Sequence, residues 1–402
     1  MRKTCKYKLI PTPEQARALE VVLSRGHTLY NVALEQRRTW WQRGQGIGAT
    51  YSRHANELPD LKAACPEYSE VHSHVVQDVL RRGDTTYQAF FHRVQDAETP
   101  GSPRFQGKGR YTRFISPQYG NGAVLDGGLL SRSKIGRIPI RLHRPLGGTP
   151  KTVTLSREAD GWSAWICCAE VPTEPLPLTG NETGIDVGWK VFLVRADGEY
   201  GEHPRHHRNA EKGVKKAQRC VSRRTNGSKR WWNAVGQRAK QHQQVKRQRG
   251  DFHHKTALCL VRQYEVISLE DLQLRNLSRR PTVKQDGNGG YEHNGAARKA
   301  GRNKSINDVG WYSFRRILTC KAAWAGKRVA ALPPAVTTQE CRGCGARIFK
   351  RLSVRTQVCT TCGLILDRDE HAARTMLASG RAGPSGGTVA RWGERSLRSP
   401  AL

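Results

Sequence analysis

Four cysteines in two short pairs form the most specific local pattern in the chain. Cys341 and Cys344 have two residues between them, as do Cys359 and Cys362, and a glycine follows each pair. Each pair can therefore form a tight turn whose backbone N–H groups point at sulfur, and four thiolates suit one closed, tetrahedral zinc site. Two disulfides or an iron–sulfur cluster are the alternatives. The spacing favours one structural zinc ion, which has no open position for catalysis.

Three acidic residues stand where apolar residues would be expected. Asp186 lies inside the strand-like sequence GIDVG, Glu270 follows the apolar run VISL, and Asp369 lies in DRDEHAA, soon after the second cysteine pair. A carboxylate in such a setting is costly unless it is paired. Three carboxylates from separate segments are what a two-metal hydrolase uses to hold two Mg²⁺ ions. Each acid alone could be solvated or could cap a helix, but the set predicts catalytic residues and magnesium ligands.

The charge of the chain points to a polyanionic partner. The 402 residues include 68 Lys and Arg against 34 Asp and Glu, which gives a formal net charge of +34. Such charge repels itself unless a polyanion neutralises it, and nucleic acid gains affinity from each counterion released. No apolar run approaches the ~20 residues that span a membrane, and the N-terminus lacks an apolar signal-peptide segment. We therefore expect a nucleic-acid-binding protein with no membrane partner.

Residues 203–255 concentrate this charge, with 16 Lys or Arg residues against two acids. Their pattern predicts two helices, broken near Asn226 and Gly227, that could hold a nucleic acid by its backbone and shape. We expect contacts from six basic residues, which are Lys215, Lys216, Arg219, Arg223, Lys229 and Arg230. Trp231 and Trp232 could stack on bases, but packing in the core is the favoured interpretation.

The elements before the acidic residues follow from periodicity and caps. Strand-like alternation at the start of the chain ends at Thr12, which can form a capping box with Gln15 and open a helix. A second helical region follows at residues 70–94. Gly- and Pro-punctuated strands then run from residue 101 to about residue 171. These strands and the first one suggest a small β-barrel interrupted by helices.

The elements around the acidic residues are expected to be strands and helices in alternation. Two strands over residues 184–199 and one over residues 265–269 would carry the first two acids. A long Gly-rich and polar segment at residues 276–304 is predicted to be a loop that could gate the site. A capping box at Ser305 and Asp308 predicts the start of the next helix.

The nuclease motifs taken together resemble the TnpB family, transposon-encoded RNA-guided DNA endonucleases related to type V CRISPR effectors. The resemblance runs through nearly the whole chain, in the segments YKLIPTPEQ, GSPRF, GIDVGWK, SLEDL, DVGWYSF, the two CxxCG pairs and DRDEHAARTML. It implies a guide RNA from the transposon end, a double-stranded DNA target cut beside a short flanking motif, and a prokaryotic protein of the cytoplasm and nucleoid. Carried over by motif, the family's acidic triad falls on Asp186, Glu270 and Asp369.

Two positions need comment within this resemblance. The third acid is assigned to Asp369 and not Asp367, because the family's acid stands two residues before an Asn that precedes two alanines. Here His371 replaces that Asn. Ser73 and Gln77 lie at i and i+4 in the region that reads the flanking motif in the family. We expect them on the side away from Val75, Val79 and Leu80, so they could address base edges. An ordinary solvated face is the alternative.

The resemblance also implies a multidomain α+β architecture. A wedge β-barrel over residues 1–12 and 101–178 would hold a helical recognition region at residues 13–100. An RNase H-like, RuvC-type nuclease domain would follow over residues 179–335 and 365–380, with a zinc ribbon inserted at residues 336–364. Residues 381–402 are predicted to be a flexible tail. The rival functions are a guide-directed DNA-binding protein or transposase accessory factor that does not cut, and a strand-joining transposase.

Overall fold

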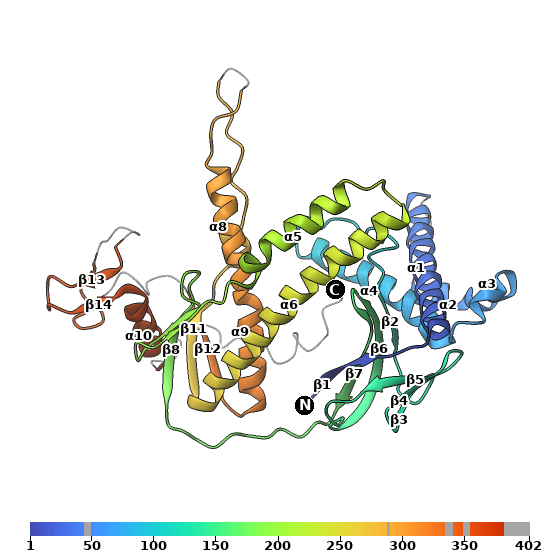
Figure 1. The fold of residues 1–402 in the computed structure, drawn as a ribbon, viewed down its shortest axis with the longest axis horizontal. Helices are drawn as coiled ribbons and strands as arrows, with labels where there is room; N and C mark the ends of the chain where they lie inside the picture. The colour runs from blue at the N-terminus through green and yellow to red at the C-terminus, as the bar shows by residue number, and fades with distance from the viewer. Residues whose placement is uncertain (44–49, 288–289, 334–340, 349–353, 382–402) are drawn as a thin grey trace. The chain divides into compact units, whose positions relative to one another are not determined.

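The computed structural model describes residues 1–43, 50–287, 290–333, 341–348 and 354–381. By contacts, the chain divides into two compact units, residues 1–172 and residues 173–402 (Figure 1). In the described residues no helix is both long enough and apolar enough to cross a membrane. The predicted tail lies outside the described residues from residue 382 onward.

The first unit contains a curled, antiparallel, seven-stranded sheet. Its order is β2-β6-β7-β1-β5-β4-β3, so the first strand of the chain pairs with strands formed more than 130 residues later. Cys5, Tyr7 and Leu9 alternate into the core along β1. The result confirms the expected small barrel, in the form of an open half-barrel. The strands are β1(Lys3–Leu9), β2(Arg113–Ser116), β3(Ala123–Asp126), β4(Leu129–Arg132), β5(Gly136–Arg141), β6(Thr149–Glu158) and β7(Gly161–Ala169).

Helices are inserted between β1 and β2, as expected. The capping box that opens α1(Pro13–Gln42) is present, because the Gln15 N–H donates to Thr12 Oγ1 at 3.2 Å and the Thr12 N–H donates to Gln15 Oε1 at 3.1 Å. The second predicted helical region is α4(Ser73–Gln95), which packs on α1 and buries Val75 and Val79. The shorter helices α2(Tyr51–Asn56) and α3(Leu58–Ala64) lie between them.

The second unit is built on a mixed five-stranded sheet in the order β10-β9-β8-β11-β12. The central strands β8(Glu182–Asp186), β11(Val266–Glu270) and β12(Arg328–Leu332) are parallel. The edge strands β9(Leu193–Arg195) and β10(Tyr200–Gly201) are antiparallel to their neighbours. Strand β12 was not predicted, because its alanine-rich sequence RVAAL has little of the β-branched and aromatic signal of a strand.

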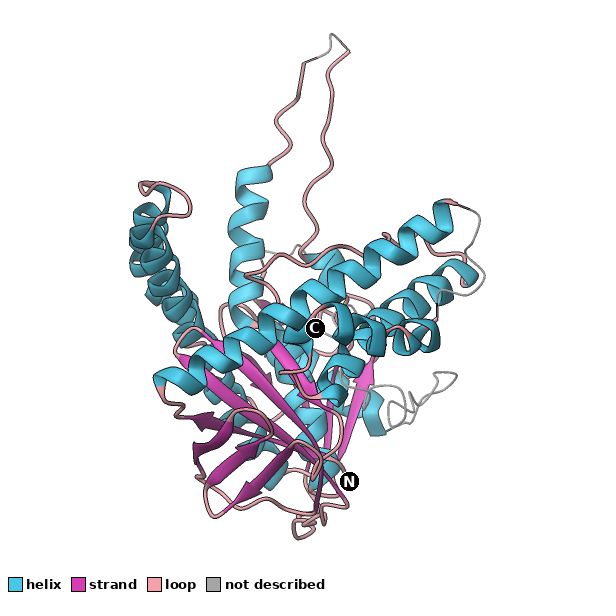
Figure 2. Ribbon diagram, turned by 90° about the vertical axis from the view of Figure 1, so that its right-hand side faces the viewer, coloured by secondary structure: helices cyan, strands magenta, loops and turns pink. Residues whose placement is uncertain are grey.

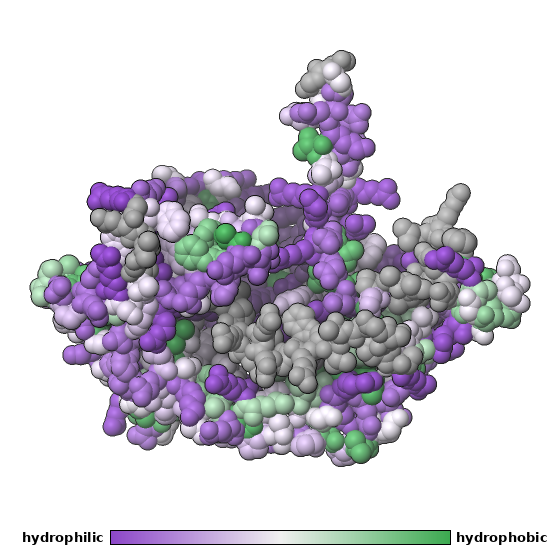
Figure 3. All heavy atoms as spheres, turned by 180° about the vertical axis from the view of Figure 1, so that it is seen from behind, coloured by the Kyte–Doolittle hydropathy of each residue, from purple (hydrophilic) through white to green (hydrophobic). Residues whose placement is uncertain are grey.

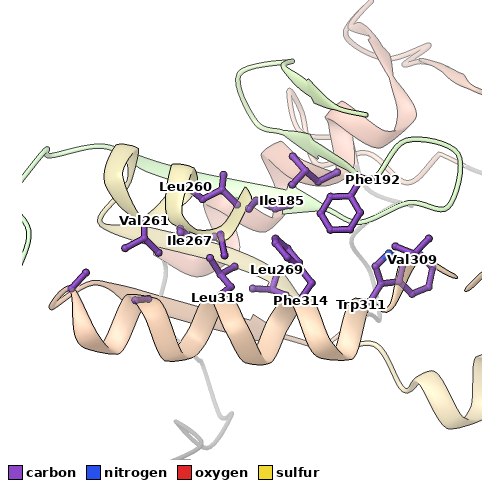
Figure 4. Close-up of a cluster of buried hydrophobic side chains, with 14 of the residues drawn as sticks. Ile185, Phe192, Leu260, Val261, Ile267, Leu269, Val309, Trp311, Phe314 and Leu318 are labelled. Carbon is purple, nitrogen blue, oxygen red and sulfur yellow. The ribbon is translucent and has the colours of Figure 1, made fainter. Parts of the chain in front are cut away.

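One face of this sheet carries the hydrophobic core. Ile185 of β8 and Ile267 and Leu269 of β11 pack against α6(Lys229–Gln263) and α9(Trp311–Trp324) (Figure 4). Phe192, before β9, meets Phe314 of α9 edge to face at 4.8 Å between ring centroids. This core fixes the strands that end in the first two acids.

The opposite face of the sheet is covered by α10(Arg368–Arg381). A Cβ at Gly184 would collide with the backbone of Ala373, and a Cβ at Gly380 would collide with the Ser268 side chain. Glycine at both positions therefore lets α10 approach the sheet closely, and the helix body is held in one place.

Two expectations after β11 were wrong. The last nine residues of the predicted loop at residues 276–304 are helical, since α8(Ala296–Val309) begins within it, and α8 with its loop extends away from the sheet (Figures 1 and 2). The capping box at Ser305 is also wrong, because Gly310, with φ of +68°, separates α8 from α9. The buried Asp308 instead accepts the N–H groups of His207 at 2.9 Å and Arg208 at 3.2 Å. It thereby caps α5(His206–Ser222) from 100 residues away.

Candidate carboxylate site and cysteine cluster

The first two acids stand at the carboxyl ends of neighbouring parallel strands. Ile185 and Leu269 are register partners and point into the core. Since side chains alternate along a strand, Asp186 and Glu270, one residue later, point to the other face, where α10 lies. Both are half-buried. Strand pairing alone therefore brings these two predicted site residues together.

The third acid reaches the same place from α10, whose first turn contains Asp369. Burial, Glu270 and Asp369 together raise the pKa of Asp186 to about 7, while Arg368 and the Val187 N–H act in the opposite direction. Mutual repulsion of three carboxylates is the condition that a divalent cation relieves, and carboxylates with water are the ligands that Mg²⁺ accepts. The residues present thus fit magnesium. They are near one another without forming, in the described residues, a group close enough for one ion to touch all three.

Asp367 and Asp369 have different partners. Asp367 Oδ1 accepts the N–H groups of Asp369 at 2.8 Å and Glu370 at 3.3 Å, so Asp367 caps α10. Asp369 accepts from Arg355 Nη1 at 2.9 Å and 3.1 Å. The cap that the sequence allowed at Asp369 is therefore made by Asp367. Arg355 was not predicted, because no spacing or motif distinguishes it among the 68 basic residues.

The four predicted cysteines converge, with sulfur atoms all within 4.8 Å of one another. The Sγ atoms of Cys341 and Cys362 are 3.5 Å apart, as are those of Cys344 and Cys359. That separation is far from the ~2.05 Å of a disulfide and near the roughly 3.8 Å between thiolates around one zinc ion.

The backbone around the cysteines favours thiolates. The glycine after each pair has positive φ, +74° at Gly345 and +73° at Gly363, which only glycine adopts without strain. The N–H groups of Cys362 and Thr361 lower the pKa of Cys359 to about 6, although burial acts in the other direction. A hairpin of β13(Thr356–Val358) and β14(Ile365–Asp367) carries the second pair. The cluster is compatible with a zinc ribbon.

The basic segment forms a helical hairpin of α5 and α6 (Figure 1). All six predicted contact residues are exposed, and among them Lys215 pairs with Glu211 at 2.8 Å. Hydrophilic residues also cover most of the described surface that Figure 3 draws. Core packing of both tryptophans was wrong, because Trp232 is 57% exposed and meets the half-buried Trp231 edge to face at 4.7 Å.

The two residues expected to read a flanking motif lie at the start of α4. Ser73 is exposed and its Oγ accepts from Lys62 Nζ at 2.8 Å, and Gln77 is half-buried one turn later. Both lie away from the buried Val75 and Val79, as expected. The buried Leu80 was expected on the far side too, which was wrong, because a residue seven positions after Ser73 lies on the same side of a helix. Their role in recognition stays a prediction.

The mixed sheet with acids at its strand ends, together with the cysteine module before the last helix, is the RNase H-like, RuvC-type arrangement that was expected. Family profiles agree with it. One described as "Probable transposase" matches residues 166–280, one described as "Cas12f1-like, TNB domain" matches residues 311–376, and a helix-turn-helix domain profile matches residues 1–46.

Relatives cover the whole chain. A Streptomyces pristinaespiralis protein named as an RNA-guided DNA endonuclease is 32% identical over 99% of this chain and 94% of its own length. Escherichia coli InsQ, named in the same way, is 27% identical over 98% of this chain and 96% of its own. This chain belongs to the TnpB family. A solved complex of Cas12f1 with guide RNA and target DNA shares the fold at a TM-score of 0.52, with 11% identity over 91% of this chain and 83% of that one.

Proposed function

We propose that this protein is an RNA-guided, Mg²⁺-dependent DNA endonuclease encoded by an insertion sequence. The observation that carries the proposal is the meeting of Asp186, Glu270 and Asp369 at one sheet edge, where burial first, and then the two other carboxylates, raise the pKa of Asp186 to about 7. The names of the S. pristinaespiralis and E. coli relatives support the guided cutting of DNA. A chain that only binds DNA would have no use for three mutually repelling carboxylates.

The three acids would hold two Mg²⁺ ions, and two of these ligands are fixed in position while the third can move. Asp186 and Glu270 are fixed by strand pairing, whereas Asp369 stands on the first turn of a helix and is held by Arg355. Its oxygens must exchange the Arg355 guanidinium for an ion. Two ions in such a site activate a water molecule and stabilise the leaving oxygen of the phosphodiester.

The remaining roles follow from charge and the family. The α5–α6 hairpin would hold a guide RNA derived from the transposon end, paired with one strand of double-stranded DNA. Ser73 and Gln77 would read the flanking motif, and the cysteine cluster would bind one zinc ion. The wedge would comprise residues 1–12 and 101–178, and the nuclease domain residues 179–335 and 365–380 around the ribbon. The protein would act in the prokaryotic cytoplasm, at the nucleoid.

The deciding experiment is guided cleavage by the native chain and by Asp186→Asn. The RNA that co-purifies with each chain is sequenced, and matching target DNA with randomised flanks is supplied with Mg²⁺. We expect the native chain to cut beside one flanking motif. The Asp186→Asn chain, which keeps the shape and loses the ligand charge, should bind the same target without cutting it. Equal cutting by both chains would refute the assignment, and binding without cutting by the native chain would favour a DNA-binding factor.

A further inference from the structure

The first turn of α10 is held differently from the rest of that helix. The helix body is fixed by close packing, with Ala373 against Gly184 and Gly380 against Ser268. Asp369 lies before that contact, at the end that follows the ribbon strand β14. Its position therefore depends on how the ribbon is attached to the helix.

His371 makes the most buried of these attachments. It is two residues after Asp369, and its side chain is 0% exposed. The backbone N–H of Arg342, which lies between Cys341 and Cys344, donates to His371 Nε2 at 3.0 Å. The side-chain amide of Gln357, in β13, lies 3.2 Å from the same nitrogen. One ring nitrogen on α10 thus meets both halves of the ribbon.

The chemistry of these contacts defines the ring. A backbone N–H can only donate, so Nε2 must be the acceptor nitrogen, and the ring is neutral with its proton on Nδ1. Gln357 must then present its NH₂ group. The acceptor is a nitrogen at the far side of the ring, a position that a shorter side chain does not reach.

A second side-chain attachment is weaker, and the Arg368 N–H also donates to the Arg355 carbonyl at 2.7 Å. The ion pair of Arg355 with Asp369 is partly exposed, at 46% and 29%, and such pairs contribute little to stability. The hydrogen bond from the Arg342 N–H is partly buried and ends on a ring that is itself 0% exposed, so water competes less for it than for the ion pair. Groups that orient metal ligands in this way commonly change metal affinity about 10- to 100-fold when they are lost.

We propose that His371 is a positioning residue that couples the cysteine turn to α10, so that metal binding by the four cysteines fixes the position of Asp369. The carboxylate site and the ribbon are then one cooperative unit, and a chain that has lost its ribbon metal needs more Mg²⁺ to cut. The part of this inference that concerns cutting rests on the proposed function. The part that concerns α10 does not.

The first test uses the native chain with and without its ribbon metal. Zinc is removed with a strong chelator, and amide hydrogen exchange is followed along α10. We expect protection to fall at residues 369–372 and to stay unchanged at residues 374–380, which the sheet holds. Equal protection in both states over residues 369–372, or an equal loss along the whole helix, would overturn the coupling.

The second test compares two substitutions of similar polarity. In His371→Gln the amide oxygen can reach the position of Nε2, whereas in His371→Asn it falls short. We expect His371→Asn to release zinc to a colorimetric chelator about ten-fold faster than the native chain, and to need more Mg²⁺ for half-maximal cutting, with guide RNA binding unchanged. His371→Gln should stay close to the native chain in both.

Three results of the second test would overturn the proposal. Equal zinc release by all three chains would mean that the hydrogen bond to His371 does not stabilise the bound zinc. Equal damage in both variants would mean that His371 only fills space. Faster release with unchanged Mg²⁺ dependence would separate the ribbon from the acids. If the native chain cuts no target, the proposed function fails, while exchange and zinc release still decide whether His371 couples ribbon and helix.

Discussion

The acid edge of the sheet and the α5–α6 hairpin use charge in opposite ways. The acid edge, defined as Asp186, Glu270 and Asp369, gathers three carboxylates at half-buried positions set by strand pairing and by a helix start. The hairpin segment, residues 203–255, spreads 16 basic residues over two long helices and the residues that flank them, and its predicted contact residues are all exposed. At the edge each residue has a position that no neighbour can take over. On the hairpin each basic residue adds to a positive electrostatic potential to which its neighbours also contribute.

This contrast predicts different responses to substitution. A change at the edge should act on one step and should be nearly complete. Changes on the hairpin should be graded, additive and sensitive to salt, because affinity from counterion release grows with each phosphate contact. The following predictions run from the largest expected effect to the smallest.

The largest effect on cutting is expected from Asp369, and its neighbour Asp367, two residues earlier, provides the comparison. Asp369→Ala should lower the cutting rate by roughly 100-fold or more, since metal ligation supplies several kcal/mol to the transition state. Asp367→Ala removes only the cap of α10, which costs about 1 kcal/mol of stability, and cutting should stay within a few-fold of native. Single-turnover cleavage at saturating Mg²⁺ measures both. The reverse order would move the third ligand to Asp367.

On the hairpin, several substitutions together should be needed for a large loss of guide RNA binding. Replacing Arg223, Lys229 and Arg230 with Gln should weaken guide RNA binding. It should also reduce the slope of log affinity against log salt by roughly 0.7 for each lost contact. The control is Lys255→Gln, which removes one charge at the other end of α6, where Lys255 pairs with Asp251 at 2.8 Å, so the two slopes are compared per removed charge. An unchanged slope in the triple variant would argue against contact at the hairpin tip.

The exposed Trp232 of the same hairpin could contribute to RNA affinity by stacking, and this contribution should not depend on salt. An indole that is 57% exposed beside Lys229 and Arg230 suits stacking on a base, which is worth about 1–3 kcal/mol. Trp232→Ala should therefore weaken RNA binding about ten-fold with the salt slope unchanged, and Trp232→Phe should lose less. RNA affinity measured at several salt concentrations separates the contribution of stacking from that of the basic residues. Native affinity in Trp232→Ala would leave the side chain without a role in binding.

The acid edge was more predictable from sequence than its surroundings. A carboxylate inside GIDVG or after VISL stands out because strand patterns are local and have a period of two residues. The partner of Asp308 could not be found in this way, because a capping pattern is local while the N–H groups that Asp308 accepts lie 100 residues earlier. The two contacts of His371 likewise depend on the ribbon folding back onto α10. The exposure of Trp232 could not be predicted from helical periodicity alone, because adjacent residues of the same helix, Leu260 and Val261, are both buried.

The smallest effect tests whether repulsion between acids, and not burial alone, distinguishes the edge. Asp78 of α4, in the first unit, is also buried, and burial raises its pKa to about 6 against the opposing influence of Arg82 and Arg81, with no second carboxylate involved. A folded-state pKa above the unfolded value means that the folded chain keeps a proton that the unfolded chain releases. Stability from this group is therefore lost as pH rises from about 4 to about 6.

Asp78→Asn keeps the neutral form at every pH and should not lose this stability. Its melting temperature should exceed that of the native chain by a margin that grows between about pH 4 and pH 6, reaches a few degrees and then levels off. Thermal unfolding across this range, with and without Mg²⁺, measures the margin. Mg²⁺ should leave it unchanged, because no carboxylate repulsion is there to relieve, whereas the same ion should stabilise the acid edge. A margin that shrinks with Mg²⁺ would mean that Asp78 also binds a cation, and the contrast between the two buried acids would fail.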